Sequence, residues 1–215
     1  MLPIEEPPET GLIAFDVAAP PVSFQATATR KAPILAAVGA LVSPCRYLLS
    51  GDVKVAIRWR ISERARYEGD GSADVDNIVK PILDALSGPS GILIDDCQVQ
   101  ELTCYWSGGY ANPEREHLEI EIGFDPDEHV SKDGLLFLSL GRGLYFPLQR
   151  DFPGEVVLHQ AEFVMECHRS AERIASLGAD ISTAHQLLPA QRVFHRSRIV
   201  AFPTTTMEEL RERFR

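Results

Sequence analysis

Histidine and cysteine, the side chains that most often hold zinc, are few in this 215-residue chain. All six histidines lie after residue 116, so any site built in the first half must work without imidazole. The four cysteines, at positions 45, 97, 104 and 167, form no C-x-x-C pair. This pattern disfavours a zinc or histidine-metal site in the first half and indicates reduced, buried thiols in a cytoplasmic protein.

Long apolar runs are also absent. The longest, residues 34–42, lies between Pro33 and Pro44 and is far shorter than the roughly 20 residues that cross a bilayer. The acidic, proline-containing start has no basic stretch of the kind that opens a secretory signal. We therefore expect a cytoplasmic protein with no membrane partner.

Positive charge is in deficit as well. The chain has 21 lysines and arginines against 31 aspartates and glutamates, which gives a net charge of -10 and a pI near 5.1. This balance excludes a wholly basic, non-specific DNA coat. It does not exclude a nucleic-acid enzyme, because such an enzyme needs only a local basic face. With 45% hydrophobic and 24% charged residues, the composition is that of a globular protein.

Charge and polarity divide the chain in two. Residues 1–124 carry 10 basic against 18 acidic side chains, a net charge of -8, and residues 125–215 carry 11 against 13, a net charge of -2. The segment 124–134 is polar and rich in turn-forming residues, so we place a boundary there. We predict a first domain over 1–124 and a C-terminal extension of unknown role over 125–215.

The first domain has the periodicities of both strands and helices. Residues 53–61 alternate between apolar and polar positions, as a half-buried strand does. Residues 77–87 place apolar side chains at helical spacing and are followed by Gly88 and Pro89, which end helices. Further strands are predicted over 12–17, 99–106 and 118–124, and a further helix over 31–42. We therefore predict an α/β fold.

The extension is predicted to be mainly helical. Residues 156–177 have the apolar spacing of a long amphipathic helix. Thr205, followed three residues later by Glu208, predicts a capping box that opens a short charged helix. The sequence GRG at 141–143 lacks the Lys-Ser/Thr ending of a phosphate-binding loop.

Acidic residues gather over 74–102. Asp74 and Asp76 stand two apart where the chain enters a helix, and Asp95 and Asp96 open the next strand. Two carboxylates about 4 Å apart repel by ~4 kcal/mol at an effective dielectric of about 20. A fold that gathers them therefore binds a cation, protonates some of them or separates them. Oxygen ligands without histidine or cysteine favour a hard cation, Mg²⁺ or Mn²⁺.

A single lysine stands among these acids. Lys80 lies four residues after Asp76, and Asp84 four residues after Lys80, so the three share one helix face. An ammonium beside metal-bound carboxylates suits phosphodiester cleavage, because it offsets the charge that develops on the phosphate. For Asp84, an ion pair with Lys80 is favoured over direct metal ligation.

A basic stretch precedes the acidic one. Between residues 53 and 67 there are five basic side chains and one acidic side chain, a local charge of +4. Such a face, next to an acidic metal site, suits a phosphate backbone, although a solvated strand face is the default interpretation. The predicted DNA-binding residues are Lys54, Arg58, Arg60, Arg64 and Arg66.

The acidic segment resembles the signature of the RusA family of Holliday junction resolvases. The resemblance rests on D-x-D-N-x-x-K-x-x-L-D-A-L from Asp74, a short glycine-containing turn, and D-D-x-Q-V-x-E-L from Asp95. It covers about residues 12–124, with specific motifs only in 74–102. Many residues at fixed offsets make this a specific signal.

The resemblance implies a fold, a reaction and residue roles. It implies a mixed sheet with flanking helices, and a homodimer that cuts four-way DNA junctions with Mg²⁺ and no organic cofactor. The catalytic acids fall on Asp74, Asp76 and Asp96, the essential lysine on Lys80, and Asp95 is expected to share the metal. Two symmetric cuts need two sites related by a two-fold axis, which also favours a homodimer.

Two other functions stay open at this point. One is a nuclease of the same chemistry that acts on flaps, replication forks or phage DNA. The other is a non-catalytic protein-interaction module that keeps the fold. The complete set of acids and lysine disfavours the second, because a binding module has no need to crowd like charges.

Overall fold

The computed structural model describes residues 2–18, 26–62, 75–109, 117–180 and 192–214. The chain forms two compact units, Met1–His129 and Val130–Arg215. The division falls inside the polar segment 124–134. Each unit has its own sheet, its own helices and its own apolar core.

The first unit is built on a mixed four-stranded sheet. Its strands are β1 (Leu12–Val17), β3 (Val53–Ser62), β4 (Val99–Gly109) and β5 (His117–Phe124). They lie in the order β1-β5-β3-β4, with β3 parallel to β4 and antiparallel to β5, and β1 antiparallel to β5. The predicted α/β fold with a mixed sheet is confirmed.

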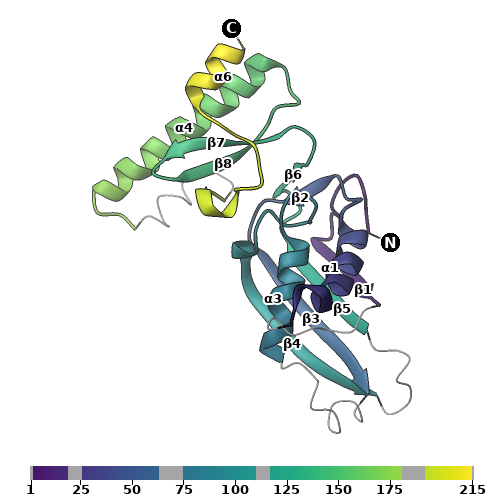
Figure 1. The fold of residues 1–215 in the computed structure, drawn as a ribbon. Coiled ribbons are helices and arrows are strands. Elements are labelled where there is room, and N and C mark those ends of the chain that lie inside the picture. The colour runs from purple at the N-terminus through teal and green to yellow at the C-terminus, as the bar shows by residue number, and fades with distance from the viewer. Residues whose placement is uncertain (1, 19–25, 63–74, 110–116, 181–191, 215) are drawn as a thin grey trace. The chain divides into compact units, whose positions relative to one another are not determined.

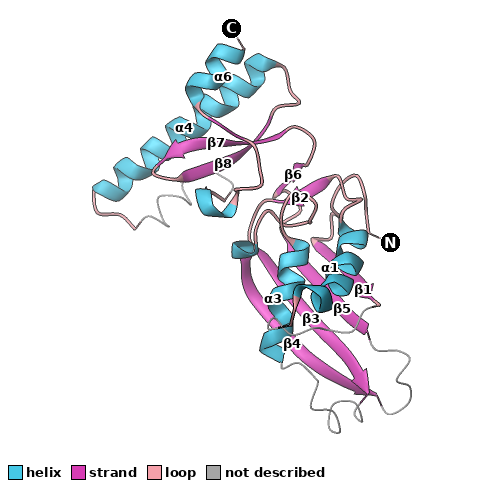
Figure 2. Cartoon of the chain, in the orientation of Figure 1, coloured by secondary structure: helices cyan, strands magenta, loops and turns pink. Residues whose placement is uncertain are grey.

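Two helices cover one face of this sheet (Figures 1 and 2). They are α1 (Ala28–Val42) and α3 (Val75–Leu86). Apolar side chains at helical spacing, such as Ile34 on α1 and Ile78 on α3, are buried together with the inward side chains of β3. Because the residues of β3 alternate, Val55, Ile57 and Trp59 enter this core and the basic residues between them face away from it.

Short elements complete this half of the chain. Strand β2 (Tyr47–Leu49) is buried, and the 3-10 helix η1 (Asp96–Gln98) lies between α3 and β4. Strand β6 (His129–Ser131) spans the division between the two units.

The second unit combines two helices with a sheet. The helices are α4 (Gly154–Ser176) and α6 (Met207–Arg213), and a 3-10 helix, η3, spans Arg196–Arg198. The strands β7 (Leu135–Gly141), β8 (Leu144–Gln149), β9 (Phe194–His195) and β10 (Thr204–Thr205) lie in the order β10-β7-β8-β9. The helical prediction is confirmed, and the sheet is an addition to it. No helix within the described ranges is both long and apolar enough to span a membrane.

The hairpin of β7 and β8 turns at the GRG sequence. Gly141, Arg142 and Gly143 all have positive φ, at 92°, 51° and 78°. Such a turn favours glycine, because a Cβ atom is strained in this region of backbone space. The glycines therefore serve a tight turn.

The start of α6 corrects the predicted capping box by one residue. The N-cap is Thr206, whose hydroxyl accepts a hydrogen bond from the Glu209 backbone N–H at 3.2 Å. The Glu209 carboxylate accepts from the Thr206 N–H at 2.9 Å. The predicted cap, Thr205, instead pairs with Leu138 of β7. Consecutive threonines and glutamates satisfy the capping pattern in two registers, and the strand pairing selects one of them.

Candidate active site

The structure places Lys80 between two carboxylates. Its ammonium nitrogen lies 2.7 Å from an Asp84 oxygen and 2.5 Å from an Asp96 oxygen. Asp84 is one turn along the same helix, and Asp96 comes from η1, sixteen residues further along the chain. The expected ion pair between Lys80 and Asp84 is confirmed. The contact with Asp96 joins the two acidic segments that the sequence placed at one site.

A tight connection brings Asp96 back to α3. Gly88 has a φ of +93°, and a Cβ atom on Gly91 would collide with the carbonyl oxygen of Leu86. That oxygen accepts hydrogen bonds from the backbone N–H groups of Ile92 and Leu93, at 2.8 and 2.9 Å. The chain therefore folds back directly onto the end of the helix, because glycine permits both the turn and the close approach.

A buried glutamine fixes the loop that carries Asp96. Gln98 has no exposed surface, and its amide oxygen accepts hydrogen bonds from the backbone N–H groups of Ile94 and Asp95, at 2.8 and 3.1 Å. Its amide nitrogen donates to the backbone oxygens of Leu49 and Gly51, each at 2.8 Å. The sequence analysis gave Gln98 no role. The signal was present, because Asp95 and Gln98 form the D-x-x-Q pattern of a capping box.

The charge state of Lys80 follows from its neighbours. Partial burial alone would lower the pKa of this ammonium, but the hydrogen bonds to Asp84 and Asp96 outweigh it and raise the pKa above its ordinary value. Lys80 is therefore a cation at neutral pH. In that state it can stabilise negative charge and cannot act as a base.

The other predicted acids differ in what the structure describes. Asp95 is the N-cap of η1, and one of its oxygens accepts from the Cys97 N–H at 2.9 Å. Asp76 lies one turn before Lys80 in α3, where only its backbone is described, and Asp74 lies outside the described residues. The metal set of Asp74, Asp76, Asp95 and Asp96 stays a prediction.

The basic residues of β3 lie on the open face of the sheet and are ion-paired. Lys54 lies 2.8 Å from Glu101 of β4. Arg58 and Arg60 share Glu119 of β5, at 2.9 and 2.5 Å. The hydrogen bond from Arg60, together with the charges of both arginines, holds the pKa of Glu119 below its ordinary value. Exposed ion pairs contribute little stability, so an incoming phosphate can replace the acid.

Two further residues of this face refine the prediction of a DNA-binding surface. Tyr105 of β4 is exposed and lies beneath the Arg58 guanidinium, 5.1 Å from ring centroid to Cζ. Trp106 instead stacks on the buried Trp59, with ring centroids 3.9 Å apart. Trp59 itself is part of the core of the first unit. Arg64 and Arg66, the remaining predicted DNA contacts, lie outside the described residues.

Among the described residues, a single group of three potential metal ligands has its ligand atoms close together, and it does not include the acids near Lys80. Asp16, His117 and Glu119 each offer a ligand atom, and these atoms lie within 4.8 Å of one another. They are on the open face of the sheet, opposite α3. Glu119 already accepts from two arginines, and the histidine nitrogen is softer than the oxygen ligands that Mg²⁺ prefers. This group fits Mg²⁺ less well than the aspartates near Lys80.

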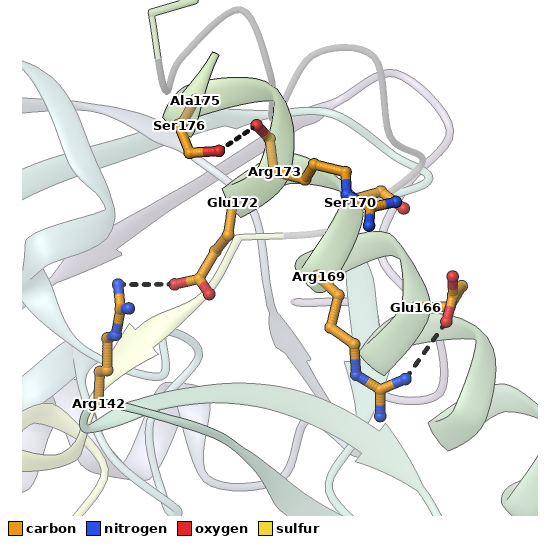
Figure 3. A pocket seen from close by; sticks show the side chains of 8 residues that line it. All are labelled: Arg142, Glu166, Arg169, Ser170, Glu172, Arg173, Ala175 and Ser176. Atoms are coloured by element: carbon orange, nitrogen blue, oxygen red, sulfur yellow. Dashed lines mark hydrogen bonds and ion pairs between the residues drawn. The ribbon is translucent and has the colours of Figure 1, made fainter. Parts of the chain in front are cut away.

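The second unit has a polar surface pocket of about 910 Å³ between α4 and the β7–β8 turn (Figure 3). Arg142 and Glu172 face each other across it at 3.0 Å, and Arg169 lies 3.3 Å from Glu166. None of the predicted site residues lines it.

The first unit thus holds a lysine clamped between acids from a helix and a following loop, above a mixed sheet. A protonated lysine held in this way can stabilise negative charge on a phosphate ester. Residues 35–123, less than half of the chain, match the family model of the endodeoxyribonuclease RusA. This part of the first unit is therefore similar to the RusA family of endodeoxyribonucleases, as the sequence resemblance implied. No curated protein matches the chain significantly.

Proposed function

We propose that this protein is a Mg²⁺-dependent, structure-specific endonuclease that cuts four-way DNA junctions. The observation that carries the proposal is the contact of Lys80 with both Asp84 and Asp96, inside the part of the first unit that is similar to the RusA family. This contact joins α3, which contains Asp76, to the loop that contains Asp95 and Asp96. It assembles at one place a cation and carboxylates, the groups that phosphodiester hydrolysis requires.

The donor set fits a hard divalent cation. Asp74, Asp76, Asp95 and Asp96 would hold it, since carboxylate oxygens are the ligands that Mg²⁺ and Mn²⁺ prefer. Bound there, the ion would supply an activated water and a positive charge beside the scissile phosphate.

Lys80 has a role of its own in this proposal. Its ammonium, kept protonated by Asp84 and Asp96, stabilises the charge that builds on the phosphate or on the leaving oxygen. Asp84 orients the ammonium and is a positioning residue. Gln98 holds the loop of Asp96 in place through its four hydrogen bonds.

The basic residues of β3 lie on the open face of the sheet, whereas Lys80 lies on α3 against the other face, so DNA that contacts both would pass around the edge strand β4. Lys54, Arg58 and Arg60 would exchange their carboxylate partners for backbone phosphates, with Arg64 and Arg66 extending the same surface. Symmetric cuts in the two strands of a junction require two copies of the domain, so we propose a homodimer.

The test is cleavage of synthetic DNA by the purified full chain with and without Mg²⁺. The substrates are a four-way junction, a flap and a linear duplex of the same sequences. Cutting of the junction alone, abolished by Asp76→Asn and unaffected by Asp127→Asn on an exposed turn, supports the proposal. Equal cutting of the flap identifies a nuclease with broader substrates. If no substrate is cut and Mg²⁺ does not raise the unfolding temperature, the domain is a non-catalytic module.

A further inference from the structure

The polar pocket of the second unit brings three arginines together. Arg142 comes from the β7–β8 turn, and Arg169 and Arg173 come from the last part of α4 (Figure 3). The hydroxyl-bearing residues Ser170 and Ser176 line the same pocket. Guanidinium and hydroxyl groups donate hydrogen bonds to oxyanions, and the planar guanidinium matches a phosphate with two parallel bonds. The lining of the pocket therefore points to a phosphate group as its ligand.

The charges of this pocket leave one arginine over. Arg142 lies 3.0 Å from Glu172, and Arg169 lies 3.3 Å from Glu166. Within the part of the chain that the structure describes, no acid lies at ion-pair distance from Arg173. Arg173 is also one helical turn from Arg169, a spacing at which like charges repel. The five charged side chains have a net charge of +1, and an anion beside Arg173 would offset the repulsion.

Arg142 occupies a backbone position that favours a different residue. Its φ is 51°, and it is the one described residue other than glycine with a positive φ. Glycine or asparagine adopts this conformation with less strain than arginine does. A strained position is retained where the side chain has a use. Here the use is to hold a guanidinium at the pocket, where Figure 3 shows it facing Glu172 of α4.

The net charge and the volume of the pocket distinguish between phosphate ligands. A free phosphate or a phosphate monoester carries close to two negative charges at neutral pH, whereas a phosphodiester carries one. The pocket, with a net charge of +1, matches the phosphodiester. Its volume of about 910 Å³ is in the range that holds a ligand of many atoms. Both properties favour a sugar-phosphate chain over a lone phosphate ion.

More positive charge lies beside the β7–β8 turn. The Arg196 backbone N–H donates to the Gly143 oxygen at 2.8 Å, and both Arg196 and Arg198 are exposed. Residues 130–215 carry 11 basic and 10 acidic side chains, a net charge of +1, whereas residues 1–129 carry 10 and 21, a net charge of -11. A local basic patch in an acidic chain is a feature of proteins that contact nucleic acid.

We propose that this pocket binds a backbone phosphate of DNA, with Arg173 and Arg142 as donors. Glu172 and Glu166 orient the paired arginines. The proposal deepens the proposed function, on which it rests for the identity of the ligand as DNA. It adds a contact outside residues 35–123, the part that matches the family model. Because a phosphate carries no sequence information, the pocket adds affinity and no sequence preference.

The first experiment measures the affinity of the full chain for a labelled four-way junction by fluorescence anisotropy. EDTA is present, so that no cleavage occurs, and the salt concentration is varied. Arg173→Glu should raise the Kd about tenfold or more and should reduce the slope of log Kd against log salt by about one. Junctions of different sequence should show the same loss.

The matched control is Arg150→Glu. Arg150 is exposed and follows β8 at the other end of the hairpin, so the variant has the same net charge but leaves the pocket unchanged. Its Kd should stay within about twofold of the parent value. Equal losses for the two variants indicate a general effect of charge and overturn the proposal. An Arg173→Glu variant that binds like the parent also overturns it.

A second variant separates binding from folding. Arg142→Asn places a residue that tolerates a positive φ at the turn and removes the guanidinium. The unfolding temperature of the second unit should not fall, because the strain is relieved and only an exposed ion pair is lost. The affinity for the junction should fall severalfold. An Arg142→Asn variant with the affinity of the parent contradicts the assignment of Arg142 as a donor.

Thermal unfolding without Mg²⁺ distinguishes DNA from a small ligand. A short duplex should raise the unfolding temperature of the second unit in the parent and not in Arg173→Glu. Inorganic phosphate at the same concentration of phosphate groups should leave it unchanged. Stabilisation by inorganic phosphate that Arg173→Glu abolishes, with unchanged affinity for the junction, identifies a small phosphate ligand and overturns the assignment to DNA.

Cleavage assays with Mg²⁺ separate this proposal from the nuclease function. A parent chain that binds DNA through Arg173 but cuts no junction refutes the nuclease function and leaves the phosphate site intact. A parent chain that cuts junctions, together with an Arg173→Glu variant that binds them equally well, refutes the phosphate site alone.

Discussion

The open face of the first unit's sheet and the open face of α4 differ in how their polarity is arranged. On the sheet, each described basic residue of β3 is paired with an acid on a neighbouring strand. On α4, charged side chains such as Glu162 and Glu166 are also paired, but apolar side chains remain exposed beside them. A surface whose charges are paired with one another is stable in water, and a charged ligand can later displace one partner of each pair. A face with exposed apolar side chains is stabilised by a permanent cover. The first pattern suits a surface at which charged ligands exchange.

The largest expected effect is on the rate of DNA cleavage, and it separates Lys80 from its ion-pair partner Asp84. Lys80→Ala should lower the rate of junction cleavage by about a hundredfold to a thousandfold, because it removes charge stabilisation in the transition state. Asp84→Asn should cost about tenfold or less, because Asp84 only orients the ammonium. Single-turnover cleavage at saturating DNA measures both. Equal losses for the two variants would place Asp84 among the catalytic groups.

The next effect separates the stabilities of the two units. Gln98→Leu leaves four backbone groups without partners and should destabilise the first unit by about 2–4 kcal/mol. The second unit, with its own core, should unfold as before. A urea titration with hydrogen exchange as the readout resolves the unfolding transitions of the two units. Gln100→Leu, at an exposed glutamine two residues away, is the control, and a similar loss there would remove the special role of Gln98.

A smaller effect is expected in the second unit alone. Thr206→Ala removes the side-chain cap of α6 and should cost about 1 kcal/mol. Thr204→Ala, one of the exposed residues before the cap, should change stability much less. Thermal unfolding of both variants checks the corrected register, and the opposite ranking would contradict it.

The smallest effect appears only in alkali and belongs to the first unit. Burial raises the pKa of the Cys104 thiol from 9.0 to about 11. Below pH 9 the thiol is protonated in both the folded and the unfolded state. It therefore contributes nothing to the pH dependence of the free energy of unfolding in that range. Between pH 9 and 11 the unfolded chain loses the proton more readily, and the free energy of unfolding falls. Cys104→Ala should flatten this decline, and an unchanged slope would assign it to other groups.

The sequence predicted the longer elements of the first unit well because each has one solvent-facing side, whereas the short strand β2, buried throughout, was not predicted. Strand β3 alternates, since every second residue is buried, and α3 shows helical spacing for the same reason. Strand β7 has no such signal. Its residues 135–138 are all buried, so both faces of the strand are apolar. The sequence therefore lacks the alternation of apolar and polar residues that indicates a strand.

One contact of the candidate site was predictable from the sequence, and others were not. The spacing of Lys80 and Asp84 on a helix predicted their ion pair. The spacing could not give the contact of Lys80 with Asp96, because that contact depends on the turn at Gly88 and Gly91. The pairing of the basic strand face with Glu101 and Glu119 was also hidden, since it depends on which strands lie beside β3.

Gln98 has a consequence for motion at the site. An outward movement of Asp96 would move the whole loop. Buried backbone N–H and C=O groups would then lose their hydrogen bonds to Gln98 without gaining water. Such an excursion requires the hydrogen bonds of Gln98 to β2 and to the turn after it to break together, which is a local unfolding event. Asp96 is therefore held as rigidly as a core residue, although it lies at the surface, and its carboxylate keeps a fixed position.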